Sequence, residues 1–152
     1  GVPGSGWANA NTPTGQKALS YKDLRYAGIQ KDQRMPEREI TVRLGGNMER
    51  YIWTLNGKKY EDSGPINLNY GERVRLTFIN DTMMAHPMHL HGMWSDLESD
   101  NGAVQVRRHT IPVQPAQRIS FLTTPHDVGR WAWHCHLLFH MDAGMFREVA
   151  VS

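Results

Sequence analysis

From Glu39 to the C-terminus the chain is built of short segments in which polar and apolar residues alternate, and this pattern limits the fold more than any other feature. Alternation with a period of two places every second side chain on one face of a β-strand. The clearest segments are EITVRL (39–44), ERVRLTFIN (72–80), HTIPVQ (109–114), QRISFLTT (117–124), GRWAWHCH (129–136) and FREVAVS (146–152). Seven or eight short strands separated by turn signals predict an all-β domain, either an antiparallel sandwich or a Greek-key barrel.

Three local patterns complete the predicted architecture. RYIWTLNGKKY (50–60) predicts a strand pair around the Asn56-Gly57 turn. LLFHMDAG (137–144) is the one segment that favours a helix, and its final glycine suits the helix end. Residues 1–35 are rich in Gly, Pro, Asn and Thr, which is typical of an N-terminal arm or linker, and we expect the folded domain to cover residues 36–152.

Composition limits the partners of the chain. With 152 residues it is long enough for one domain with a real core, and its net charge is only +2. We therefore expect no nucleic acid partner. The apolar runs are too short to span a bilayer, so we expect no membrane insertion. The first fifteen residues have neither the charged start nor the apolar centre of a signal peptide. A single cysteine excludes an internal disulfide.

Two stretches concentrate the side chains that bind metals: HPMHLHGM (86–93) and WAWHCHLLFHMDAGM (131–145). Together they hold six of the eight histidines and the only cysteine, so a function has to account for both. In a strand that ends in WAWHCH, Cys135 shares a face with Trp131 and Trp133, which is the face toward the core. The histidines on either side of Cys135 point the other way.

The same parity argument sorts the candidate ligands into two sites. Cys135 and His86 go to the first site, although the proline after His86 weakens its assignment. His140 and Met145 follow Cys135 at intervals of five residues, and a tight loop can fold both back onto the thiol. Two imidazoles, one thiolate and a weak thioether are the ligands of a blue-copper electron-transfer centre. Zinc more often takes several cysteines or a Cys2His2 set, which one cysteine cannot supply.

The second site has four imidazoles and no thiol. Its candidate ligands are His89, His91, His134 and His136. Coordination by nitrogen alone, with some coordination positions left open, suits copper that binds dioxygen. Because two of these histidines flank Cys135 in the chain, an electron that reaches the first copper has a short covalent route to the second site.

The motifs HPMHLHG and HCHLLFHMDAGM resemble the C-terminal copper motifs of the multicopper oxidases. GNMERYIWTLNGKKY, YGERVRLTFINDTMMAHPMHLHGMW and HCHLLFHMDAGMFREV are similar to segments of the bacterial copper-resistance oxidases, and the resemblance covers residues 15–152. It implies that the type 1 (blue) copper ligands are His86, Cys135, His140 and Met145. It also implies that His89 is a type 2 ligand and that His91, His134 and His136 are type 3 ligands.

The resemblance further implies a fold and a reaction. The fold is a cupredoxin-like Greek-key β-sandwich, and the reaction is one-electron oxidation of phenols or Cu(I) at the type 1 copper, with O2 reduced to water at the type 2/type 3 cluster. The expected compartment is the periplasm or the outside of the cell. The family's cluster uses eight imidazoles and this chain supplies four, since His109 and His126 are isolated. We therefore expect another cupredoxin domain or identical subunits to complete it.

Alternatives remain open at this point. The chain could be an electron-transfer or copper-binding module that uses only the type 1 site without O2 turnover, or a protein that sequesters copper. Four methionines around the first motif either fill the core or dock Cu(I) through their thioethers: Met83, Met84, Met88 and Met93. We expect His109 and His126 to be ordinary surface residues and Trp131 and Trp133 to be core residues. Asp142 is a candidate for orienting a ligand.

Overall fold

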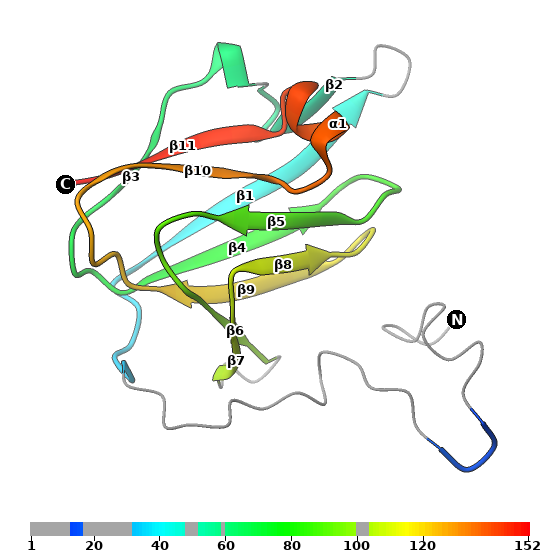
Figure 1. Cartoon of the computed structure of the whole chain (residues 1–152), viewed down its shortest axis with the longest axis horizontal. Coiled ribbons are helices and arrows are strands. Elements are labelled where there is room, and N and C mark those ends of the chain that lie inside the picture. Colours follow the sequence, from blue (N-terminus) through cyan, green and yellow to red (C-terminus); the bar gives the residue numbers. More distant parts are fainter. Residues whose placement is uncertain (1–12, 17–31, 48–51, 59, 100–103) are drawn as a thin grey trace.

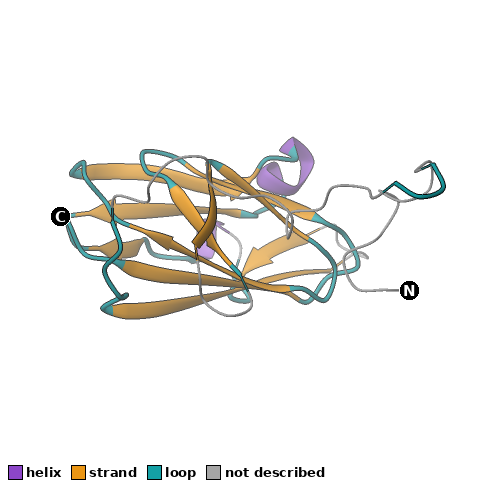
Figure 2. Ribbon diagram, turned by 90° about the horizontal axis from the view of Figure 1, so that it is seen from below, coloured by secondary structure: helices purple, strands orange, loops and turns teal. Residues whose placement is uncertain are grey.

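The computed structural model describes residues 13–16, 32–47, 52–58, 60–99 and 104–152, and it shows two β-sheets packed as a sandwich (Figures 1 and 2). The six-stranded sheet has the order β2 (Ile52–Leu55), β1 (Arg38–Asn47), β4 (Val74–Asn80), β9 (Arg118–Thr123), β6 (Ser95–Glu98) and β7 (Val104–Arg108). The five-stranded sheet has the order β3 (Ile66–Leu68), β11 (Phe146–Val151), β10 (Gly129–Cys135), β5 (His86–Leu90) and β8 (Thr110–Val113). In the described ranges the helical segments are α1 (Leu138–Asp142) and a 3-10 turn at Tyr60–Asp62.

The predicted all-β sandwich is confirmed, but the sheets are mixed and not purely antiparallel. β1 pairs with β4 in parallel, and β11 pairs with β3 in parallel, while the other strand pairs are antiparallel. Parallel neighbours need a crossover connection. Here the chain leaves β2 in one sheet, adds β3 to the other sheet and returns to β4, and this crossing makes both parallel pairs.

The core lies between the two sheets, where the inward half of each alternating strand is buried. In β5, for example, His86, Met88 and Leu90 are buried while the residues between them are partly exposed. The largest side chains of the core are Trp53 and Trp133. Aromatic contacts between Phe78, Phe121 and Trp133 join the two sheets.

Several local expectations hold and one is wrong. α1 forms where the sequence predicted a helix, and Gly144 follows its end with a φ of 118°. Asn56 and Gly57 both have positive φ, as a tight hairpin turn requires. The expected second strand of that hairpin does not form among the described residues. Only an isolated bridge joins Leu55 to Lys58, and β2 pairs with β1 instead.

No sequence pattern indicated strand β6, because three of its four residues are polar or charged. All four residues are nevertheless buried. The carboxylates of β6 are matched by an arginine of the neighbouring β7 and by two arginines at the start of β4, one of them just before the strand. Asp96 bonds to Arg73 at 3.1 Å and to Arg107 at 2.9 Å, and Glu98 bonds to Arg75 at 2.8 Å. Buried charges are tolerated when they are paired and hydrogen-bonded in this way.

The segment before β1 is attached to the sandwich where the structure describes it. The Asp32 carboxylate accepts a hydrogen bond from the Thr124 hydroxyl at 2.6 Å, and the Glu37 amide donates to the carbonyl of Arg73 at 2.7 Å. Most of the predicted arm lies outside the described residues, and the division at residue 35 stays a prediction. Among the described residues no helix is long and apolar enough to cross a membrane.

Candidate metal centre

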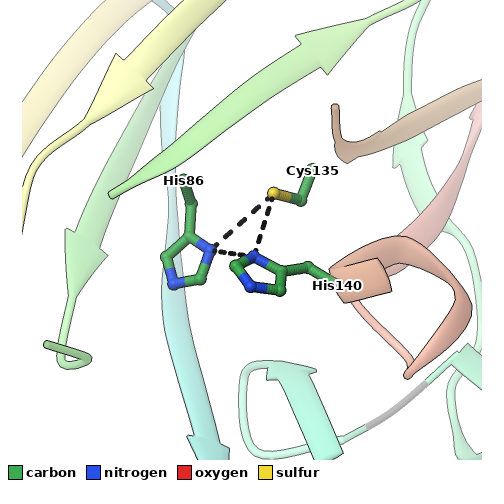
Figure 3. A group of neighbouring side chains, drawn as sticks. All are labelled: His86, Cys135 and His140. Atoms are coloured by element: carbon green, nitrogen blue, oxygen red, sulfur yellow. Dashed lines mark hydrogen bonds between the residues drawn. The ribbon is translucent and has the colours of Figure 1, made fainter. Parts of the chain in front are cut away.

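Three side chains from separate elements converge in the interior. His86 is the first residue of β5, Cys135 is the last residue of β10, and His140 lies in α1. The distance from Cys135 Sγ to His86 Nδ1 is 3.7 Å, that to His140 Nδ1 is 3.6 Å, and the two nitrogens are 3.1 Å apart (Figure 3). All three residues are buried, so water competes little for the space between them.

This triangle matches the size of a trigonal metal site. Bonds of about 2.0 Å to nitrogen and 2.3 Å to sulfur, set at 120°, separate nitrogen from sulfur by about 3.7 Å and nitrogen from nitrogen by about 3.5 Å. Both nitrogen–sulfur distances agree within a tenth of an ångström, and the nitrogens need to move apart by only a few tenths. Two imidazoles and one thiol are therefore already arranged as a three-ligand set.

The protonation states of the three ligands follow from burial. Burial and the nearby His140 lower the pKa of His86 to about 4, and burial lowers the pKa of His140. Burial also raises the pKa of the Cys135 thiol to about 11. At neutral pH both imidazoles are uncharged, and the thiol holds one proton that a metal ion has to displace.

Thr82, which the sequence reasoning missed, determines which nitrogen of His86 faces the thiol. Its hydroxyl lies 2.7 Å from His86 Nε2 and can donate onward to Asn80 Oδ1 at 2.7 Å. With Nε2–H donating to this hydroxyl, Nδ1 keeps its lone pair toward Cys135. In the sequence, the position of Thr82 four residues before His86 only weakly indicates that its hydroxyl contacts this ligand.

Met145 directly precedes β11, the strand that follows α1. It is fully buried in the same core cluster, its amide donates to the carbonyl of His140, and its carbonyl accepts from the amide of Cys135. These backbone bonds hold residues 135, 140 and 145 in one tight loop. The proposed role of Met145 as axial ligand stays a prediction.

The other four histidines form a second group, on the outward face of the five-stranded sheet; we call it the imidazole face. Its members are His89 (partly buried), His91 (exposed), His134 (buried) and His136 (exposed). The register explains the separation of the two groups. His134 lies opposite His89, and Cys135 lies opposite Met88 on the inward face, so the parity prediction is confirmed.

Within the imidazole face, two histidines form a pair. The Nε2 atoms of His91 and His134 are 3.0 Å apart, and His134 Nδ1 lies 2.9 Å from the carbonyl of Cys135, to which it can donate. The ring centre of His136 lies 6.1 Å from that of His134 and 5.8 Å from that of His89. The ring centres of His89 and His91 are 4.4 Å apart, so the four rings form one group in which His91 and His134 bring their Nε2 atoms together.

His89 is oriented by two groups that the sequence did not single out. Its Nδ1 lies 2.9 Å from the carbonyl of His109 and 3.1 Å from the hydroxyl of Thr110, which leaves Nε2 directed outward. His109 is exposed as expected, but its ring also stacks on Trp94 with centres 3.7 Å apart. Carbonyl partners of this kind fix the tautomer of metal-binding histidines.

The remaining candidates divide between core and surface. Met88 and Met93 are buried in the core, whereas Met83 and Met84 are exposed, so Cu(I) docking by the latter two stays a prediction. Trp133 is a core residue and Trp131 packs against the core. His126 is exposed and lines a cavity of about 290 Å3 together with His109. Asp142 is exposed at the end of α1.

Gly92, which directly follows His91, is required by the packing around the imidazole face. Its φ is +78°, and a Cβ at this position would overlap the ring of Trp131. We expect Gly92→Ala to lower the free energy of unfolding by about 1–2 kcal/mol through the left-handed backbone, and by about 1–3 kcal/mol more through overpacking. Chemical denaturation measures the total.

Gly57→Ala is the matched control for this prediction. Gly57 has nearly the same backbone angle, +75°, but a Cβ there meets no atom within 4 Å. It should therefore show the backbone cost alone. Equal losses of stability in the two variants would contradict the proposed clash with Trp131.

Comparison with known proteins identifies the family of this chain. The profile of the family described as multicopper oxidase matches residues 33–152. The chain is 53% identical over 150 residues to copper resistance protein A of Escherichia coli, which covers 99% of this chain and 24% of that protein. It is 38% identical over 110 residues to the multicopper oxidase MmcO of Mycobacterium tuberculosis, covering 72% of this chain and 22% of that protein.

A solved structure supports the fold. The McoA multicopper oxidase of Aquifex aeolicus superposes with a TM-score of 0.67 at 24% identity, over 84% of this chain and 31% of that chain. The chain spans about a quarter of the length of the curated relatives it matches.

Proposed function

Because the chain belongs to the multicopper oxidase family, we propose that it is a copper domain of an oxidase that takes single electrons from phenols or Cu(I) and reduces O2 to water. The observation that carries this proposal is the buried triangle of His86, Cys135 and His140, which has the size and chemistry of a trigonal copper site. We assign these three residues as the type 1 ligands and Met145 as the weak axial ligand.

Copper bound in this set would supply reversible one-electron chemistry, because thiolate favours the reduced ion and imidazole accepts both oxidation states. The protein's own part is to hold the ligands. The Thr82 hydroxyl can accept the Nε2–H of His86, which frees Nδ1 for a metal. Burial keeps both imidazoles neutral, and the 135–145 loop fixes the spacing of Cys135 and His140. A rigid, dry ligand set limits the rearrangement that accompanies each electron transfer.

The imidazole face is proposed as half of the O2-reducing cluster, with His89 as a type 2 ligand and His91, His134 and His136 as type 3 ligands. The close pair of His91 and His134 suits two ligands of one ion, whereas His89 and His136 suit single ligands of others. Four imidazoles do not fill such a cluster, so another cupredoxin domain or a second copy of this chain has to face them. Periplasmic or extracellular location is proposed from the resemblance to copper resistance protein A.

A second candidate is an electron-transfer or copper-binding module without O2 turnover. It is favoured by one observation: in the described part of the chain, nothing faces His91 and His136 from outside, and both are exposed. Copper stoichiometry together with mass in solution separates the two candidates. One copper per monomer supports the module, and additional copper bound only in an assembly supports the oxidase.

The type 1 assignment predicts different results for its equatorial and axial ligands. Met145→Leu should keep the intense visible band of copper-bound thiolate and raise the reduction potential, because only a long, weak bond is lost. His140→Ala should abolish or greatly alter the band, because it removes one corner of the triangle. Visible spectra and redox titration of the copper-loaded variants measure both effects. Equal damage from the two changes would show that the axial ligand is misassigned.

A further inference from the structure

Trp53 closes one side of the candidate type 1 site. Its ring centre lies 4.3 Å from that of His140 and 5.0 Å from that of His86, and the two imidazole centres are 4.8 Å apart. The three rings therefore form a closed group in which the indole touches both nitrogen ligands. Trp53 is only 2% exposed, so it separates this side of the site from solvent.

The strand that carries Trp53 is tied to the ligand loop and not only to its own sheet. β2 pairs with β1 in the six-stranded sheet, but the Trp53 amide donates to the carbonyl of Ala143 at 3.1 Å, just after α1. On the other side, the buried Arg147 donates to the carbonyl of Leu55 at 2.6 Å. The indole is thus held from both directions by residues 143–147, which follow His140 in the chain.

We propose that Trp53 is a positioning residue for the type 1 ligands, and this inference rests on the copper function proposed above. The indole limits rotation of both imidazoles away from Cys135, because it packs edge-on with the His86 ring and at a tilt against the His140 ring. The indole also keeps water away from the Nδ1 atoms of His86 and His140. The His86–Cys135–His140 triangle is consequently preformed before any metal arrives, and its trigonal shape resists relaxation afterwards.

The competing explanation is that Trp53 only fills the core. Trp133 provides the comparison, because it is equally buried and of the same size, yet its ring contacts are with Phe78 and Phe121. Both tryptophans contribute to stability through buried apolar area. Of the two indoles, Trp53 packs against the candidate imidazole ligands, whereas the ring contacts of Trp133 are with phenylalanines, so the two roles separate in measurements that report on the imidazoles.

The experiment compares Trp53→Leu and Trp53→Phe with Trp133→Leu in the full chain. After copper loading, we expect Trp53→Leu to shift the visible thiolate band and the reduction potential and to weaken copper binding about 10–100-fold. Trp53→Phe keeps an aromatic ring and should show smaller shifts. Trp133→Leu should lose as much stability while it keeps the wild-type band.

A second measurement uses metal-free protein, so it does not depend on the copper assignment. Hydrogen–deuterium exchange at the imidazole C2 positions should become several-fold faster at His86 and His140 in Trp53→Leu, and stay unchanged at His91 and His134. If Trp53→Leu does not fold, the same comparison is made with Trp53→Phe.

Two results would overturn the inference: a band and exchange rates in the Trp53 variants equal to those of wild type, or equal changes in the Trp133 variant. A wild-type protein that binds copper without the visible band would instead contradict the proposed function. In that case the exchange rates of the metal-free protein still decide whether Trp53 positions the imidazoles.

Discussion

Cys135→Ser should remove the intense visible band of the copper-loaded protein entirely and lower copper affinity at this site by orders of magnitude. The band arises from thiolate bound to Cu(II), and a serine hydroxyl is neither soft nor readily deprotonated. Spectra and equilibrium dialysis against copper measure the two effects. His126→Ala is the matched control, because His126 is exposed and lies outside both ligand groups.

The same substitution should also change the proton balance of copper binding. The pKa of the thiol is raised to about 11, so wild-type protein at neutral pH should release one proton from Cys135 for each type 1 copper bound. Protons compete with the metal, so affinity should rise about tenfold per pH unit above the lowered pKa values of both imidazoles and below the raised thiol pKa. In Cys135→Ser this release should vanish. A variant that stays coloured, or a wild type that binds copper without releasing a proton, would contradict the assignment of Cys135 as ligand.

O2 consumption should depend on a second set of imidazoles. We expect the monomeric chain to keep the type 1 band and to show no turnover of O2, because the imidazole face supplies only four ligands. If copies of the chain assemble with metal between these faces, specific activity should fall on dilution as the assembly dissociates. Oxygen uptake measured against protein concentration, with molecular mass measured in parallel, gives the result.

His136→Ala tests the imidazole face directly. In an assembly that takes up O2, it should lower that uptake about 100-fold while it spares the visible band, because His136 is exposed and belongs to the imidazole face, not to the buried type 1 triangle. His126→Ala again serves as control and should leave both properties unchanged. Full activity in a demonstrated monomer would mean that one domain builds a competent O2 site alone, and the proposed partner requirement would be wrong.

Much of the candidate site could be predicted from the sequence because it rests on local rules. The alternation of side chains along a strand placed Cys135 on the inward face and its neighbouring histidines on the outward face, and the register of β10 with β5 confirms this. The intervals from Cys135 to His140 and Met145 predicted a short loop, which α1 forms. The motifs identified the family for the same reason, since ligand spacing is written within short segments of chain.

Other features are absent from any local pattern, because they depend on which distant strands become neighbours. The crossing from β2 to β3 and back creates the two parallel pairs, and the same passage brings Trp53 and Leu55 against residues 143–147. The sequence of β6 is typical of a surface segment. The strand is buried in the structure because Arg73 and Arg107 supply charges opposite to that of Asp96.

The division of the imidazole face was likewise decided by tertiary structure. Four histidines at alternate positions look equivalent in the sequence, yet only His91 and His134 approach within 3.0 Å. The sequence by itself determined which residues can be ligands and which face each one occupies, because covalent spacing and the two-residue period of a strand are local. The tertiary structure alone decided which ligands meet and which side chains hold them, because packing between segments some forty to ninety residues apart sets those distances.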